Sequence, residues 1–278
     1  MRLGRLARCG GIALAAAGGT AVAAGAQDRV ANPHVTVSLV PEFQGAVPGS
    51  PLHLAVRFQL EPGWHIYWEN PGQAGIATSV KWSVPPGIGI GALDWPVPEL
   101  LPIAGIITHV HHGDVVLVTR LSLPSRPLLS PVRIGAAIRY GVCRDLCLPG
   151  SAELSLELPW VTREARPDPA WRPVARALVN RRAPPGDAPS VHGTLRDSVV
   201  ILEVQSPRAM AGQVTFFPAD QGIASAAVTA IVSPTARRAI LRLPLVGSPA
   251  GPLRGVLVLG NPSASAPLGF PLSVPLRR

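Results

Sequence analysis

The stretch "VRIGAAIRYGVCRDLCLPGSAELSLEL", residues 132–158, decides the fold, because two strand patterns flank a short polar turn. Alternate residues of a strand share one face. One face of the first strand carries Ile134, Ala136, Ile138 and Tyr140. The other face carries Arg133, Arg139 and Cys143. Only Arg144, Asp145 and Leu146 separate Cys143 from Cys147. We therefore predict a tight hairpin that holds both sulfurs near the surface at its tip.

Short apolar stretches recur along the rest of the chain, with turn-forming residues between them. The chain contains 32 prolines and 28 glycines, which favour short strands and turns over long helices. Further strands are predicted at 34–40, 52–60, 115–123, 198–205, 213–218, 226–232, 238–245 and 254–260. Such a series is typical of β-sandwiches. We therefore predict an all-β protein with a first β-sandwich at 28–160 and a second, smaller one at 191–278.

One segment between the two sandwiches has a helical pattern instead. Asp168 suits the N-cap of a helix and Pro169 suits its first position. The apolar stripe that follows consists of Trp171, Val174, Ala175 and Leu178. The Pro-rich run "RRAPPGDAPS" comes next, at 181–190. Residues 161–190 are therefore predicted to be a helix and a linker.

The N-terminus has the three parts of an export signal. Arginines at positions 2, 5 and 8 precede a short apolar run, and "AGA" at 24–26 offers a small-residue cleavage site. The apolar run is too short and too rich in Gly and Ala for a good membrane span. Residues 1–26 are predicted to be a signal peptide that is cleaved together with Cys9. Because the composition also suggests a GC-rich bacterial genome, we expect a periplasmic protein, in a compartment that permits disulfides.

The charge distribution argues against a nucleic-acid-binding protein. The formal net charge is +9, from 25 Lys and Arg against 16 Asp and Glu, and without the three signal arginines it is 22 − 16 = +6. The basic residues are scattered, without a Lys/Arg block or interleaved aromatic residues. The sequence also lacks a P-loop, a GxSxG motif and an HExxH motif. The two cysteines therefore carry the main chemical signal.

The dithiol has three possible roles: redox exchange, structural stapling and metal binding. A loop this short stabilises a fold by only about 2 kcal/mol in the chain-entropy model, so stapling is a weak reason for the pair. Exposed disulfides are the exchanging kind. Arg139 and Arg144 would favour a thiolate and Asp145 would oppose it. The spacing differs from the C-x-x-C of a thioredoxin helix.

Four motifs in sequence order carry a resemblance to a known family. They are "GWHIYWENPGQAG" (63–75), "LDWPVPELL" (93–101), "THVHHGDVVL" (108–117) and "YGVCRDLCLPG" (140–150). Together they resemble the N-terminal periplasmic domain of the DsbD family of thiol:disulfide interchange proteins. The cysteine spacing is closest to the ScsB-like branch, which is linked to suppression of copper sensitivity. The resemblance implies an immunoglobulin-like sandwich with Cys143 and Cys147 as the redox pair and Cys147 facing the partner.

The resemblance also implies a cap loop that shields the redox pair. Tyr140, Arg139 and Arg144, which lie in or beside the cysteine motif, are predicted to be supporting residues. The cap motif falls on Thr108, His109, Val110, His111, His112 and Gly113. Better-known family members have aromatic residues in place of His111 and His112. From the residues alone, the histidine cluster has three readings: a surface loop, a cap whose imidazole assists a thiol, and a copper or zinc site formed by His109, His111 and His112.

The functional prediction is therefore a periplasmic thiol-disulfide exchange protein without a bound cofactor. The resemblance implies that a separately encoded membrane electron-transfer protein reduces the pair. It also implies that the pair then reduces periplasmic thioredoxin-like or disulfide-isomerase-like proteins. Two alternatives stay open at this point: a copper-handling or copper-tolerance protein, and a structural adaptor with a non-exchanging disulfide.

Overall fold

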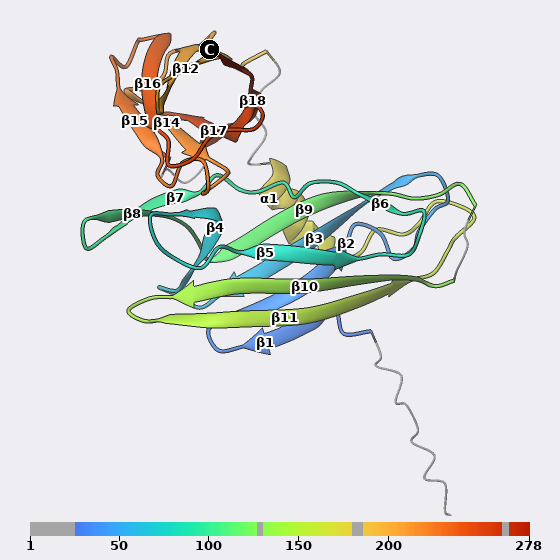
Figure 1. The fold of residues 1–278 in the computed structure, drawn as a ribbon. Coiled ribbons are helices and arrows are strands. Elements are labelled where there is room, and N and C mark those ends of the chain that lie inside the picture. Colours follow the sequence, from blue (N-terminus) through green and yellow to red (C-terminus); the bar gives the residue numbers. More distant parts are fainter. Residues whose placement is uncertain (1–25, 127–129, 180–185, 263–266) are drawn as a thin grey trace, which may run out of the picture.

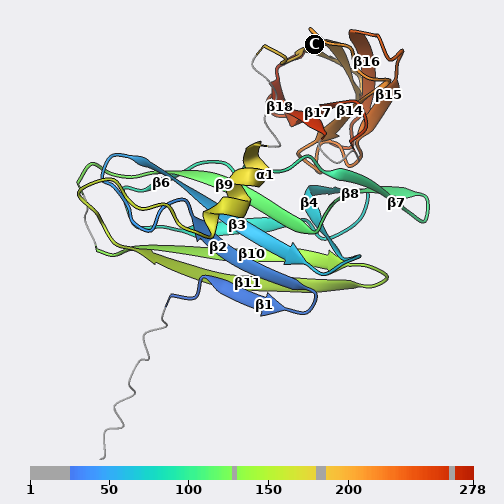
Figure 2. The same cartoon turned by 180° about the vertical axis from the view of Figure 1, so that it is seen from behind.

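The structure is a computed structural model that describes residues 26–126, 130–179, 186–262 and 267–278. Apart from Ala26, the predicted signal peptide lies outside the described residues. Within the described part of the chain, no helix is long and apolar enough to cross a membrane. The described chain forms two β-structured units joined by one helix, as Figures 1 and 2 show from opposite sides. The predicted all-β class is confirmed.

The first unit is a sandwich of two sheets that are antiparallel throughout. One sheet has the order β1 (Arg29–Asn32), β2 (Val35–Pro41), β3 (Pro51–Leu60), β9 (Asp114–Ser122) and β6 (Gly89–Ile90). The other has the order β11 (Cys147–Leu158), β10 (Val132–Cys143), β4 (His65–Gly72), β8 (Ile106–His112) and β7 (Glu99–Ile103). A further strand, β5 (Ser79–Ser83), also pairs with β10. The second sheet contains the predicted cysteine hairpin.

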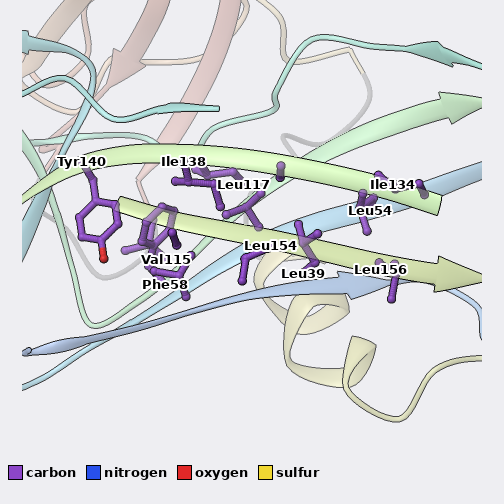
Figure 3. Close-up of a cluster of buried hydrophobic side chains, with 14 of the residues drawn as sticks. Leu39, Leu54, Phe58, Val115, Leu117, Ile134, Ile138, Tyr140, Leu154 and Leu156 are labelled. Atoms are coloured by element: carbon purple, nitrogen blue, oxygen red, sulfur yellow. The ribbon is translucent and has the colours of Figure 1, made fainter. Parts of the chain in front are cut away.

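The β10–β11 hairpin pairs without interruption from Val132↔Leu158 to Cys143↔Cys147. Its alternation is as predicted, because Ile134, Ile138 and Tyr140 lie in the core between the two sheets. Figure 3 shows them facing Leu39, Leu54, Phe58 and Leu117 of the opposite sheet. Removing these apolar side chains from water stabilises the sandwich. Because Cys143 has the opposite parity, it lies on the outer face of its sheet.

The helix α1 (Trp171–Val179) begins two residues after the predicted first position, Pro169. The carboxylate of Asp168 accepts a hydrogen bond from the Ala170 N–H at 2.8 Å, as expected of a residue that caps a helix start. Val174 is fully buried on the outer face of the first sheet, against Val40, Ala55, Val116 and Val118. The helix therefore covers that face.

The second unit consists of two four-stranded sheets. One has the order β16 (Arg238–Pro244), β13 (Val199–Gln205), β12 (Ser190–Arg196) and β19 (Leu276–Arg277). The other has the order β15 (Val228–Ile231), β14 (Gln213–Pro218), β17 (Leu253–Leu259) and β18 (Leu268–Val274). Its core, with Leu202, Phe216 and Leu257, is separate from the core of the first sandwich. The exact domain limits at 160 and 190 stay a prediction.

The two sandwiches meet through a buried junction on β4 and β8. Trp68 and Phe217 pack edge to face, with ring centroids 6.2 Å apart, and Val256 and Val258 join them in one apolar cluster. The fully buried Asn70 donates hydrogen bonds across the junction to the carbonyl oxygens of Pro218, at 2.7 Å, and Ala224, at 3.0 Å. The second sandwich is thus attached to the sheet that carries the disulfide.

Candidate redox site

Cys143 and Cys147 form a disulfide that closes the tip of the β10–β11 hairpin, with their Cα atoms 4.1 Å apart. The two cysteines differ in accessibility. Cys143 is 1% exposed, whereas Cys147 is an exposed residue. Leu146 in the turn is 68% exposed beside it. An incoming molecule can therefore reach the sulfur of Cys147 but not that of Cys143.

The strand register places two histidines in line with the disulfide. Cys147 pairs with Cys143, Cys143 pairs with His65 on β4, and His65 pairs with His112 on β8. Directly opposed residues of neighbouring strands present their side chains on the same face, with Cβ atoms about 4.5–5.5 Å apart. We call Cys147, Cys143, His65 and His112 the dithiol row. It crosses four adjacent strands.

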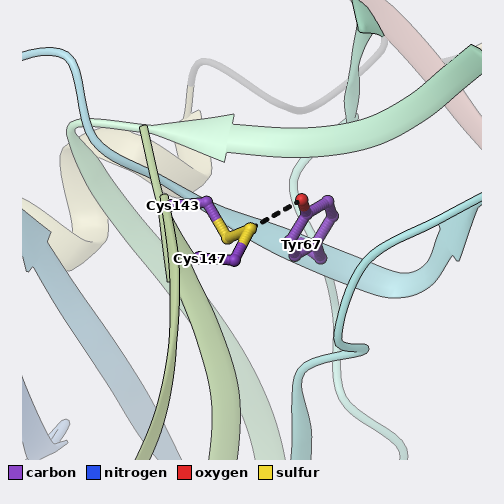
Figure 4. Close-up of a disulfide and its surroundings, with 3 residues drawn as sticks. All are labelled: Tyr67, Cys143 and Cys147. Atoms are coloured by element: carbon purple, nitrogen blue, oxygen red, sulfur yellow. Dashed lines mark hydrogen bonds between the residues drawn. A yellow bond between two sulfur atoms is a disulfide. The ribbon is translucent and has the colours of Figure 1, made fainter. Parts of the chain in front are cut away.

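Tyr67 covers the disulfide from the next position along β4. Its hydroxyl lies 3.4 Å from Cys147 Sγ (Figure 4), and its side chain forms a small buried cluster with Val110, Cys143 and Leu101. Burial raises the pKa of Tyr67, so the phenol stays protonated and can donate a hydrogen bond. Gly75 has a φ of 117°, and a Cβ there would lie 2.3 Å from the Tyr67 ring. The turn-rich "NPGQAG" therefore makes room for this tyrosine.

His65 is the more deeply buried of the two histidines in the dithiol row. It is 3% exposed, and its Nε2 has no hydrogen-bond partner among the described residues. The pKa of His65 is lowered from 6.5 to about 4, chiefly by burial and to a smaller extent by the charge of His112, while Glu99 opposes the shift. The imidazole is therefore neutral at neutral pH.

His112 ends the dithiol row at the solvent. Its ring lies 5.4 Å from the His65 ring, and its Nδ1 lies 3.2 Å from a carboxylate oxygen of Glu99, with both side chains partly exposed. The hydrogen bond from His112 is the main cause of a lowered pKa of Glu99. The row thus runs from the exposed Cys147 at one end to a solvent-facing His–Glu pair at the other.

The segment predicted as a cap loop is strand β8, because it pairs with β4 on one side and β7 on the other. Its residues therefore alternate between two faces. Val110 and His112 lie on the disulfide face, whereas His109 and His111 lie on the opposite one. His111 is buried and stacks on Trp95. The three histidines do not converge, which corrects the expectation of a single shielding loop.

His109 belongs to the junction between the sandwiches. Its Nδ1–H donates to the Asn70 carbonyl oxygen at 2.9 Å, and its Nε2 accepts a hydrogen bond from the Ala227 N–H at 3.1 Å. Both nitrogens are therefore occupied in a neutral tautomer. Among the described residues, no group of three or more His, Cys, Asp or Glu side chains is placed to hold a metal ion. The copper or zinc alternative stays a prediction.

The three predicted supporting residues occupy different positions relative to the disulfide. Arg144 is in the turn, where its guanidinium carbon lies 5.2 Å from the Trp64 ring centroid and its Nε lies 3.1 Å from Asp145. Arg139 is exposed on the outer face, about 13 Å along the strand from Cys143. Tyr140 lies in the core, where its hydroxyl accepts a hydrogen bond from Asn32 at 2.7 Å. Of the three, only Arg144 adjoins the disulfide.

Sequence reasoning did not assign His65, Tyr67 and Glu99 to the site. The alternation in "WHIYW" did place His65 and Tyr67 on one face of a strand. It could not show that this strand pairs with Cys143, because the register between strands 77 residues apart in the chain is set by tertiary packing.

The fold and the site define a class of protein: a β-sandwich with a disulfide that closes a short loop at the tip of a hairpin. Residues 36–159 match the protein family described as "Thiol:disulfide interchange protein DsbD, N-terminal". This match supports a DsbD-N-like domain in the segment, which is the family that the sequence motifs predicted. No curated protein matches the sequence.

A solved structure shares the architecture of most of the chain. The N-terminal periplasmic domain of ScsB from Proteus mirabilis matches with a TM-score of 0.60 and 16% sequence identity. The match covers 90% of this chain and 98% of that one, so both sandwiches have counterparts in the shared fold. The GAE domain of yeast GGA1, at 12% identity and a TM-score of 0.27, covers 47% of this chain and 95% of its own and is too dissimilar for comparison.

Proposed function

We propose that this protein is a periplasmic thiol-disulfide exchange protein, in which the Cys143/Cys147 pair relays reducing equivalents to periplasmic disulfide proteins. The thiol-disulfide interchange family of residues 36–159 supports this reaction class. The periplasmic location rests on the export-type N-terminus and on the likeness to a periplasmic domain of ScsB. A membrane-embedded electron-transfer protein is the proposed donor, and thioredoxin-like proteins are the proposed acceptors.

The observation that carries the proposal is the unequal burial of the two sulfurs. Exchange proceeds by attack of a thiolate on a disulfide sulfur through a mixed disulfide. An exposed Cys147 beside the exposed Leu146 offers one accessible sulfur and an apolar contact for a partner. The buried Cys143 is held next to it by the hairpin register, in the position of a resolving cysteine.

In the proposed cycle, the Cys147 thiolate attacks a disulfide of the acceptor protein. One acceptor sulfur becomes bonded to Cys147, and the other leaves as a thiolate and takes up a proton. The Cys143 thiolate then attacks Cys147 Sγ, which forms the internal disulfide and releases the second acceptor sulfur. The acceptor has gained two electrons, which the membrane donor returns to the Cys143/Cys147 pair.

The experiment that tests the proposal is a measurement of the reduction potential of the pair. The protein is equilibrated in glutathione buffers, free thiols are alkylated, and the reduced fraction is read by mass spectrometry. A potential above about −300 mV, in the range of exchanging disulfides, is expected. A lower value would identify a structural disulfide and would favour the adaptor alternative.

A further inference from the structure

The dithiol row leaves one question open: how the buried Cys143 loses its proton. Cys143 is 1% exposed, so bulk water does not reach its sulfur directly. The resolving step nevertheless needs Cys143 as a thiolate, since the thiolate is the nucleophile. A group next to Cys143 must accept the proton, and the strand register shows which group is there.

His65 is the cross-strand neighbour of Cys143 on β4. Its Nε2 is buried and has no hydrogen-bond partner among the described residues. An unpaired buried polar atom costs free energy, of the order of 1–3 kcal/mol. Reduction of the disulfide creates a Cys143 S–H group on the same face, at the spacing of a directly opposed pair. In the described part of the oxidised protein, this acceptor therefore has no donor, and reduction supplies one on the neighbouring strand.

We propose that His65 is the proton acceptor of Cys143 in the reduced protein and that His112 passes this proton to solvent. This inference rests on the proposed exchange function and names the residues that control it. In the resolving step, the Cys143 thiol gives its proton to His65 Nε2, and the thiolate attacks Cys147 Sγ. The Cys143–Cys147 bond forms while the bond to the partner sulfur breaks. The partner leaves as a thiolate that is protonated by water, and His65 returns its proton through His112.

The surroundings of His65 restrict when it takes the proton. The groups that face it are Tyr67 on its own strand, Cys143 on β10, His112 on β8 and Glu99 on β7. Burial holds the pKa of His65 at about 4 beside the disulfide. A Cys143 thiolate adds a negative charge next to the imidazole, which favours its protonated form. The proton therefore moves to His65 only as the thiolate forms, and the two groups titrate as a pair.

The test uses the His65→Phe variant of the full protein, which keeps a ring against Tyr67 and removes both nitrogens. The matched control is His192→Phe, the same change on β12 of the second sandwich. Glutathione disulfide is the probe, and acid-quenched samples are separated by mass spectrometry into mixed and internal disulfide. We expect the resolving step of His65→Phe to be slower than wild type by about tenfold or more near neutral pH. The Cys143 pKa should rise by about one unit or more, which corresponds to tenfold in the equilibrium.

A second measurement keeps the inference testable if His65→Phe does not fold. In the wild-type protein, the ¹⁵N resonances of the histidine rings are followed by NMR as the pair is reduced. His65 Nε2 should shift on reduction and the pKa of His65 should increase, whereas the His192 resonances should not change. An unchanged His65 resonance would overturn the inference, as would a folded His65→Phe protein with wild-type resolution and Cys143 pKa.

These outcomes are distinct from a failure of the proposed function. Glutathione disulfide is a small probe, so the resolving step can be followed whether or not a protein acceptor is known. If the function is wrong, the wild-type protein itself will not exchange with protein disulfides. If only the inference about His65 is wrong, the wild-type protein will exchange and His65→Phe will behave in the same way.

Discussion

Two buried histidines lie on opposite faces of the β4–β8 strand pair, and they differ in how their nitrogens are used. His65 is 3% exposed beside the disulfide and His109 is 0% exposed at the junction with the second sandwich. Burial lowers the pKa of each to about 4. The two nitrogens of His109 bind Asn70 and Ala227, whereas Nε2 of His65 has no partner among the described residues.

This difference separates a structural role from a chemical one better than burial or pKa does. A buried polar atom that is fully paired stabilises the arrangement around it. A buried polar atom without a partner costs free energy, so each one needs an explanation, of which a redox or catalytic role is one. The comparison therefore assigns His109 to the joining of two domains and His65 to the chemistry of the dithiol.

The largest effect is expected from substitution of the cysteines themselves. Cys147→Ser should abolish exchange with a disulfide substrate, because the accessible nucleophile is lost. Cys143→Ser should still form the mixed disulfide but should not resolve it, so the complex accumulates. Non-reducing electrophoresis with a thioredoxin-like substrate distinguishes the two outcomes. Accumulation with Cys147→Ser instead would reverse the assigned order of attack. The junction lies on the opposite face of β4 and β8 from the disulfide, so thermal unfolding of both variants should remain a single transition that includes the second sandwich.

The next largest effect is expected when the same substitution is made at the two histidines. His109→Phe removes two hydrogen bonds and leaves the partly buried Ala227 N–H and the Asn70 carbonyl without this partner, which should lower the free energy of unfolding by about 3 kcal/mol. His65→Phe removes an unpaired polar atom and should change it by less than about 1 kcal/mol. Urea denaturation at pH 7 measures the free energy of unfolding of both variants. Equal losses of stability in the two variants would mean that the hydrogen bonding of the ring nitrogens does not distinguish His109 from His65.

Acidification should destabilise the protein through both histidines. Since the folded pKa of His109 is about 4 and its ordinary value is 6.5, the unfolded chain binds the proton first as the pH falls. The contribution of His109 to the free energy of unfolding is fully present above pH 6.5 and is lost as the pH falls toward 4. The free energy of unfolding should decrease by about 2 kcal/mol between pH 7 and pH 5. Urea denaturation at the two pH values should show this loss, and His109→Phe should show a smaller one. An equally large loss in His109→Phe would assign the pH dependence to other groups.

The smallest effect is expected at Tyr67. Tyr67→Phe keeps the ring over the disulfide and removes only the hydroxyl that lies 3.4 Å from Cys147 Sγ. A hydrogen bond to a thiolate favours the charged form, so the Cys147 pKa should rise by a few tenths of a unit. First-order alkylation rates of the reduced protein as a function of pH measure this shift. A lower pKa in the variant would show that the hydroxyl does not stabilise the thiolate.

Much of the fold could be predicted from the sequence, because strand alternation is a local property. The hairpin, the inward residues such as Ile138 and the outward Cys143 follow from alternation alone. The helix was predicted from its cap at Asp168, although Ala177 packs on the sheet together with Leu178, where the predicted stripe had Ala175. Packing against the sheet decides which residues of the helix are buried, so the buried face differs from the predicted stripe by one residue.

The site was less predictable, because it depends on which strands are neighbours. The cluster "HVHH" gave a true indication that β8 lies beside the disulfide, through Val110 and His112. It could not reveal where His109 and His111 pack, because His109 binds a second sandwich that is distant in sequence and His111 stacks on Trp95 of another segment. Nothing in the local sequence distinguishes the unpaired buried nitrogen of His65 from a paired one.

Strand β8 has a consequence for how this protein can be divided. One face of it supports the disulfide through Val110, and the other binds the second sandwich through His109. A fragment cut at the linker would leave the first sandwich with Trp68 and His109 facing water and the Asn70 amide without its acceptors. The two sandwiches therefore have separate hydrophobic cores but share a buried interface. A fragment that keeps this junction intact therefore has to contain both sandwiches.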